Sequence, residues 1–144
     1  MKVKRLNEYA VIPTRGSEYA AGYDLYCAMA PEETIMIPPH NTRMIPTGLA
    51  MELPKNGFGG IFARSGLASK QGLRPANCVG IVDADYRGEV MVALHNDTDE
   101  VQYVRGQSRI AQLVILNYHT QVFEEVNELQ NTDRSSGGFG STGQ

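Results

Sequence analysis

The sequence has few of the residues that small secreted or zinc-binding proteins need. It contains two cysteines among 144 residues, Cys27 and Cys78, and neither belongs to a CxxC pair or to a cysteine–histidine pattern with metal-ligand spacing. A disulfide framework needs a larger even set of cysteines, and a structural zinc site needs four clustered ligands. The sequence therefore excludes both, and we expect the two thiols to be reduced.

Long hydrophobic runs are also absent. The longest apolar stretch, IAQLVIL at 110–116, is far shorter than the roughly 18 residues of a membrane-spanning helix. The first residues, MKVKRLNEYAVI, lack the apolar region of a signal peptide. We therefore expect a soluble, cytoplasmic protein that has no membrane partner.

The chain carries little excess charge. Its formal net charge is -3, 20% of its residues are charged, and no basic block is present. Proteins that bind nucleic acid polymers usually cluster lysine and arginine on one surface, so a polymeric nucleic acid is not expected as a partner. A small anion can still bind to a local group of arginines and backbone N–H groups.

Proline and glycine divide the chain into short segments. There are 7 prolines and 15 glycines, and no window repeats apolar residues at helical spacing over three turns. Alternating segments between turn residues predict strands at 2–6, 22–28, 34–37, 43–53, 59–63, 88–96 and 109–119. This pattern favours an all-β sandwich, jelly roll or barrel.

The length fits one domain. A single short helix is expected at 65–70, with Ser65 as its N-cap. From residue 131 the composition shifts to polar residues and glycine, which cannot bury enough apolar area to fold alone. We therefore expect a β domain over residues 1–130 and a flexible glycine-rich arm over 131–144.

Two stretches contain residues suited to phosphate or metal. ARSGLASK places Arg64 and Ser65 at the start of the expected helix, where free N–H groups favour an anion; the alternative is an ordinary surface helix that Ser65 caps. In YAAGYDLY, Asp24 lies among aromatic and aliphatic residues. An inward carboxylate must be paired or must bind a cation, such as Mg²⁺ held through water, whereas simple strand alternation would point Asp24 into solvent.

The stretch NCVGIVDADYRGEV suits a nucleoside. It forms two strand halves around a turn that contains Asp83 and Asp85. The backbone of a hairpin, helped by Asn77, can recognise the edge of a flat base, and Tyr86 can lie against a sugar or ring. An aspartate there can orient and deprotonate a water molecule. The alternative is an ordinary polar turn.

The closing stretch RSSGGFGSTGQ combines glycines with hydrogen-bond donors. Its glycines allow the backbone to approach a ligand closely, and Arg134, Ser141 and Thr142 offer donors to phosphate. Phe139 is unusual for a flexible linker but can stack on a base; the alternative is a mobile tail. The stretch GQSRIAQLVIL, with Arg109 and Gln112, taken alone indicates only a loop that leads into a strand.

Five stretches, in order, resemble the motifs of the trimeric dUTP pyrophosphatase (dUTPase) family: AGYDLY, RSGLASK, GIVDADYRGEV, GQSRIAQLVI and RSSGGFGSTG. The resemblance implies a jelly-roll-like distorted barrel or sandwich, assembled as a homotrimer with active sites shared between subunits. It also implies Mg²⁺-assisted hydrolysis of dUTP to dUMP and pyrophosphate, with the arm closing over the site. This activity would limit uracil in DNA and supply dUMP for dTTP synthesis.

The resemblance also implies roles for single residues. Asp83 matches the aspartate that directs water at the α-phosphorus, and Asp24 matches the one that holds Mg²⁺ through water. The residues that match base and sugar contacts are Asn77, Gly80, Tyr86 and Phe139. Those that match phosphate contacts are Arg64, Ser65, Gly66, Gln112, Arg134, Ser141 and Thr142.

One position departs from the family pattern, and two rival functions remain. Ser135 stands where the family's last motif has a glycine, and a non-glycine residue resists positive φ; we expect closure of the arm to survive because the later positions match. One rival is a dCTP deaminase-like enzyme, which the intact GIVDADYRGEV and GGFGSTG argue against. The other is a nucleotide-responsive regulatory protein on the same scaffold, which would not need Asp83.

Overall fold

The computed structural model describes residues 1–137. This part of the chain contains twelve short strands and one helix. In chain order they are β1 (Lys2–Arg5), β2 (Thr14–Arg15), β3 (Tyr23–Tyr26), β4 (Thr34–Ile37), β5 (Thr42–Pro46), β6 (Leu49–Glu52), β7 (Gly57–Phe62), α1 (Ser65–Gln71), β8 (Leu73–Pro75), β9 (Gly80–Val82), β10 (Met91–Asn96), β11 (Gln102–Arg105) and β12 (Arg109–Asn117).

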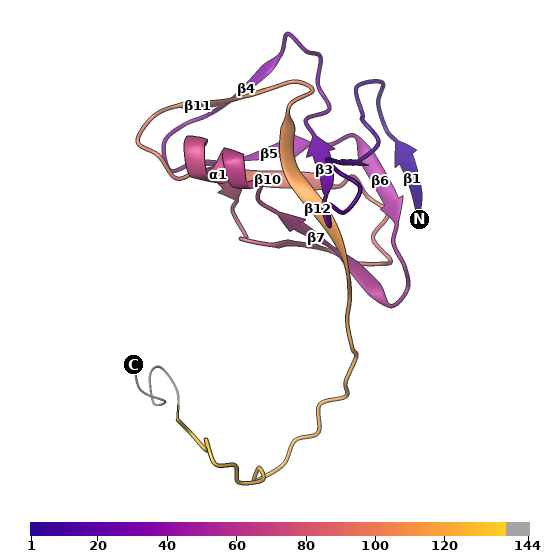
Figure 1. Ribbon diagram of the computed structural model, residues 1–144, viewed down its shortest axis with the longest axis vertical. Helices are drawn as coiled ribbons and strands as arrows, with labels where there is room; N and C mark the ends of the chain where they lie inside the picture. Colours follow the sequence, from indigo (N-terminus) through magenta and orange to yellow (C-terminus); the bar gives the residue numbers. More distant parts are fainter. Residues whose placement is uncertain (138–144) are drawn as a thin grey trace.

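The strands form antiparallel sheets. The largest has the order β2-β3-β12-β7-β9, and a second has the order β5-β10-β8. Two further pairs are β1-β6 and β11-β4. Figure 1 shows β12 alongside β3 in the body of the molecule. Buried side chains from these sheets form one core cluster. The predicted all-β, jelly-roll-like fold with one short helix is confirmed.

The prediction of one strand over 43–53 was wrong. The chain turns at Thr47 and Gly48, so that β5 pairs with β10 whereas β6 pairs with β1. Gly48 has φ +64°, and a Cβ atom there would lie 2.8 Å from the Cβ of Ala10. The turn therefore depends on a glycine, which alternation of apolar residues does not reveal.

The predicted helix is present, but its cap differs from the prediction. The helix begins at Ser65, and the N-cap position belongs to Arg64, which has extended backbone angles and makes no side-chain capping hydrogen bond. Ser65 is thus the first helical residue and not the cap. The helix buries none of its own residues fully and ends at Gly72, a left-handed C-cap.

Asn96 is one of two fully buried polar side chains in the described residues. Its Nδ2 donates to the carbonyls of Ile37, Pro38 and Glu100, and its Oδ1 accepts from the backbone N–H and hydroxyl of Thr98. The side chain therefore ties the end of β10 to the end of β4 and to the loop before β11. Full hydrogen bonding compensates for its loss of contact with water.

The chain has no helix or strand between the end of β12 and residue 137. This segment leaves the body of the molecule and extends away from it (Figure 1). Apolar side chains in it are exposed: 96% of Val122, 99% of Phe123 and 86% of Leu129. Across the described residues, no helix combines the length and the apolar character needed to cross a membrane.

Replacing Asn96 with alanine should destabilise the fold strongly. The substitution leaves three carbonyls and the groups of Thr98 without their partner, so we expect the free energy of unfolding to fall by about 2–4 kcal/mol. Urea denaturation followed by circular dichroism measures the change. Asn127→Ala, at an exposed position, is the matched control; equal stability of the two variants would contradict the structural role of Asn96.

Candidate functional site

A hollow of about 400 Å³ lies where the loop before β3, β3, α1 and β12 meet. Five of the predicted site residues line it: Asp24, Arg64, Ser65, Gly66 and Gln112. The other lining residues are Gly16, Ala20, Gly22, Leu67, Lys70, Gln71 and Arg109. We call this the phosphate hollow. Three cationic side chains and a single carboxylate line it, so the charge favours an anion.

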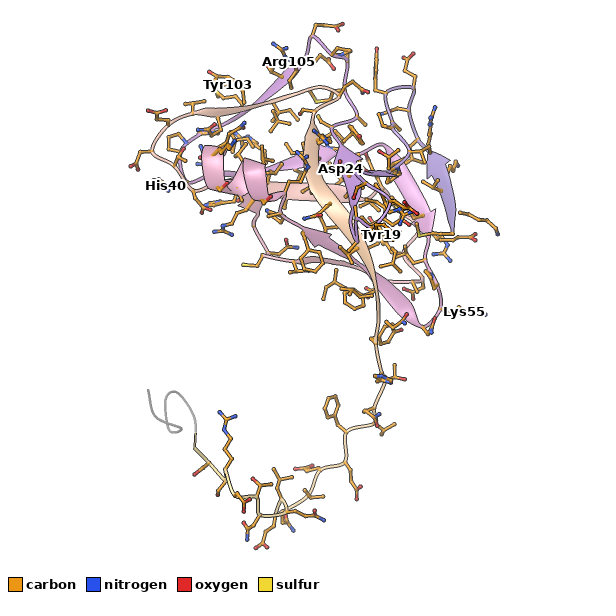
Figure 2. All side chains as sticks on the ribbon, in the orientation of Figure 1. Tyr19, Asp24, His40, Lys55, Tyr103 and Arg105 are labelled. Atoms are coloured by element: carbon orange, nitrogen blue, oxygen red, sulfur yellow. The ribbon has the colours of Figure 1, made fainter. Side chains whose placement is uncertain are left out.

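Asp24 holds two arginines at the phosphate hollow. Arg64 Nε donates to Asp24 Oδ1 at 2.9 Å, and Arg109 Nη1 donates to Asp24 Oδ2 at 3.2 Å. The Asp24 side chain is only 13% exposed, compared with 27% for Arg64 and 49% for Arg109. The alternative that Asp24 points into solvent was therefore wrong. Its carboxylate is paired, and each guanidinium keeps further N–H donors that Asp24 does not use. Figure 2 labels Asp24 in the middle of the body.

Gln112 lies directly opposite Asp24 in the ladder between β3 and β12. Its Nε2 donates to the carbonyl of Ala63 at 2.9 Å, which leaves one N–H of the amide for a ligand. A Cβ atom at residue 22 would lie 2.4 Å from Gln112 Oε1. Gly22 is therefore required for Gln112 to occupy this place.

A second hollow of about 290 Å³ lies beside β9, and we call it the nucleoside hollow. The predicted residues Asn77, Gly80, Asp83 and Tyr86 line it. Its other lining residues are Met44, Ile61, Ile81, Val82, Glu89, Val90 and Met91. These four residues, predicted for water activation and for base and sugar contacts, therefore lie together. The fifth residue predicted for base contact, Phe139, lies outside the described residues.

The strand halves predicted around Asp83 do not pair with each other. Strand β9 pairs with β7, whereas β10 pairs with β5 and β8. Strand β9 is the last strand of its sheet, so its outer edge has no partner strand within the described residues. Residues 80–83 and 89–91 all line the nucleoside hollow. Backbone N–H and C=O groups of a free strand edge can recognise the edge of a flat base.

The turn that carries Asp83 is closed by a hydrogen bond from the N–H of Tyr86 to the carbonyl of Asp83, at 3.1 Å. The hydroxyl of Tyr86 donates to the carbonyl of Glu89 at 3.2 Å. Asp83 is exposed and lines the nucleoside hollow. Both Asp83 and Asp85 line a further hollow of about 630 Å³, together with Lys55, Ala84, Arg87 and Tyr118. Of the two aspartates, only Asp83 lines the nucleoside hollow.

Comparison with known proteins gives a consistent family. The dUTPase family model matches residues 8–143. The chain belongs to the dUTPase family. It is 44% identical to the deoxyuridine 5′-triphosphate nucleotidohydrolase of Syntrophotalea carbinolica, over 99% of this chain and 96% of that protein. It is 45% identical to the enzyme of the same name from Arabidopsis thaliana, over 99% of this chain and 82% of that protein.

Solved structures of dUTPases have the same fold. A variant of the Staphylococcus bacteriophage 80alpha dUTPase with dUpNHpp aligns with a TM-score of 0.89 and 28% identity, over 99% of this chain and 98% of that chain. The dUTPase from Staphylococcus aureus phage phi11 aligns with a TM-score of 0.79 and 26% identity, over 91% of this chain and 98% of that chain.

The last dUTPase motif lies partly outside the described residues. Its residues Phe139, Ser141 and Thr142 are among those that the structure does not describe. Arg134 is exposed, and its Nε donates to the carbonyl of Gly137 at 3.0 Å; it lines neither hollow of its own chain. Ser135 has φ +45°, and its N–H donates to the carbonyl of Thr132 at 3.0 Å. The serine therefore adopts the left-handed conformation that a glycine at this position of the motif would favour.

Sequence reasoning noted Arg109 but did not assign it to the site. Residues 109 and 112 are three apart, so regular alternation along a strand would place them on opposite faces. The ladder between β12 and β3 shifts register between Arg109 and Ala111, and this irregularity brings both side chains to the phosphate hollow. No residue pattern in the stretch indicates such a bulge.

Asp24→Asn should weaken binding at the phosphate hollow. The amide keeps the size of the side chain but removes the charge that orients Arg64 and Arg109. We expect the affinity for dUpNHpp to fall about tenfold, the effect of one lost charge-assisted interaction. Isothermal titration calorimetry measures it.

The control for this variant is Asp99→Asn, which removes an exposed carboxylate paired with His40. An exposed pair of this kind contributes little, so its affinity for dUpNHpp should equal that of the unmodified chain. An Asp24→Asn variant with unchanged affinity would contradict the role assigned to the two ion pairs.

Proposed function

We propose that this chain hydrolyses dUTP to dUMP and pyrophosphate. The observation that carries the proposal is that dUTPase-motif residues line two hollows of different chemistry. One holds arginines, and the other combines an aspartate with the free edge of a strand. The substrate has the same division, because its phosphate chain is an anion and its uracil is a flat, neutral hydrogen-bonding group.

The proposed reaction is an in-line displacement at the α-phosphorus. The oxygen of a water molecule forms a bond to this phosphorus, and the bond to the oxygen that bridges the α- and β-phosphates breaks. Pyrophosphate leaves with the electron pair of that bond. Asp83 is proposed to orient the water molecule and to accept its proton. The exposed position of its carboxylate beside the nucleoside hollow supports this role.

The phosphate chain is proposed to bind in the phosphate hollow. Arg64 and Arg109 are already fixed by Asp24, so their free donors need little reorganisation when an anion arrives. Gln112 contributes its remaining amide N–H, with Ser65 and Gly66 beside it. In the arm, Arg134, Ser141 and Thr142 are proposed to close on the terminal phosphates.

Base and sugar are proposed to bind in the nucleoside hollow. The free edge of β9 at Gly80 offers backbone groups of fixed direction, and Asn77 adds a side-chain amide. A cytosine would leave some of these groups unpaired, which costs more than a lost contact. Tyr86, fixed through Glu89, packs under deoxyribose, and Phe139 stacks on the base.

Mg²⁺ is the proposed cofactor. The described residues contain no group of three His, Cys, Asp or Glu side chains that could hold a metal ion. Asp24, the one carboxylate that lines the phosphate hollow, has lone pairs beyond those that accept from the arginines. This donor set fits an ion bound chiefly by substrate phosphates and water. Bound there, Mg²⁺ would neutralise charge on the phosphate chain and the leaving pyrophosphate.

The active site is proposed to be shared in a homotrimer. The phosphate hollow and the nucleoside hollow have no lining residue in common, so neither alone offers a full dUTP site. The segment after β12 also carries exposed Val122, Phe123 and Leu129 away from its own body (Figure 1). Such side chains gain from burial against another subunit.

The proposed cellular role is to limit uracil in DNA and to supply dUMP for dTTP synthesis. The family match and the hollow beside Asp83 do not favour the two rival functions, a dCTP deaminase-like enzyme and a regulatory nucleotide-binding protein.

Pyrophosphate release tests the proposal. With Mg²⁺ present, we expect rapid release from dUTP and little from dCTP, dTTP or UTP, because base and sugar are both recognised. A chain that ends at Asp133 should lose most of this activity, since it lacks Arg134 and the rest of the last motif. A chelator should abolish the release, and added Mg²⁺ should restore it.

Each result has a distinct meaning. No release from dUTP by the full chain would contradict the proposed function. Equal release by the shortened chain would remove the arm from the mechanism while leaving the enzyme. Full activity in the presence of the chelator would show that the reaction does not need the metal ion.

A further inference from the structure

The turn that carries Asp83 has few internal constraints. One backbone hydrogen bond, from the N–H of Tyr86 to the carbonyl of Asp83, closes it. Within the described residues, the carboxylate of Asp83 makes no hydrogen bond or ion pair of its own. The direction of this carboxylate therefore depends on how firmly the surrounding backbone is held.

Arg87 supplies hydrogen bonds to this backbone. Its Nη1 donates to the carbonyl of Ala84 at 2.8 Å and to the carbonyl of Tyr86 at 2.9 Å. These carbonyls lie on either side of Asp85, so a single guanidinium nitrogen spans the second half of the turn. Hydrogen bonds from a charged donor are stronger than those between neutral groups.

Acidic side chains lie near Arg87 but form no ion pair with it within the described residues. Asp83 and Asp85 line the same hollow as Arg87, together with Lys55, which Figure 2 labels at the edge of the body. The pKa of Glu52 is lowered mainly by its hydrogen bond and charge interaction with Lys2, and Arg87 adds a smaller effect. Within the described chain Arg87 nevertheless forms no ion pair and donates to the two carbonyls instead.

We propose that Arg87 is a positioning residue that fixes the Asp83 turn in the geometry that water activation requires. This inference rests on the proposed function, because it assigns Arg87 a task in the step that Asp83 performs. Arg87 lines the hollow that it shares with Asp83 and Asp85 and not the nucleoside hollow, and within the described residues it forms no ion pair with Asp83. It therefore acts through the backbone and not by contact with the nucleoside.

The test compares Arg87→Ala, Arg87→Lys and the unmodified chain. For Arg87→Ala we expect kcat for dUTP to fall about tenfold to a hundredfold, the usual effect of a small misplacement of a reacting group. Its Kd for dUpNHpp should change less than about threefold, because ground-state contacts remain. Arg87→Lys keeps a cationic donor and should have an intermediate kcat.

Chemical rescue separates positioning from general stability. Low concentrations of guanidinium, which replace the missing donor, should raise the kcat of Arg87→Ala without changing that of the unmodified chain. Arg5→Ala removes an exposed arginine that makes no side-chain hydrogen bond within residues 1–137. It should match the unmodified chain in kcat and should not respond to guanidinium.

Three results would overturn the inference. The first is an unchanged kcat in Arg87→Ala. The second is a loss of dUpNHpp affinity equal to the loss of kcat, with no rescue by guanidinium, which would indicate general disruption of the turn. The third is an unmodified chain that does not hydrolyse dUTP; this would contradict the proposed function itself, whereas the first two leave it intact.

Discussion

The contact of Asp24 with Arg64 and Arg109 is the interaction on which the phosphate hollow depends. It joins β3, the residue before α1 and the start of β12, three elements that are far apart in the sequence. Two guanidinium groups this close would repel each other without a carboxylate between them. With it, they are held in place and their charges still exceed that of Asp24 by one, which leaves the hollow able to attract an anion.

The second half of the site has the opposite character. The nucleoside hollow has apolar walls, the free backbone edge of β9 and two carboxylates, Asp83 and Glu89. A polyanion would not be stable there, and a neutral base would gain little in the phosphate hollow. This separation within one chain is the physical reason to propose a site completed by a second copy, with Asp83 brought to the α-phosphate only in the assembly.

Much of the fold and of both hollows could be predicted from the sequence, for identifiable reasons. Alternation located β10 and β12, and the motif stretches contain Asp24, Arg64 and Gln112, which lie together in the structure. The predictions that were wrong or incomplete concern places where backbone geometry overrides the alternation of apolar and polar residues. Gly48 breaks an apolar run into two strands in different sheets, and the bulge after Arg109 turns its side chain to the face of Gln112. The lack of pairing between the two strand halves around Asp83 depends on distant partners, which local patterns do not indicate.

The central claim is that one chain supplies the phosphate hollow and another supplies Asp83. The most direct test mixes two inactive variants, Arg64→Ala and Asp83→Asn, by unfolding and refolding them together, and measures pyrophosphate release from dUTP. The account predicts recovery to about a quarter of the unmodified activity, because random assembly completes a site from two intact halves with that frequency. No recovery, from variants that each assemble normally, would contradict the account and place both halves of the site in the same chain.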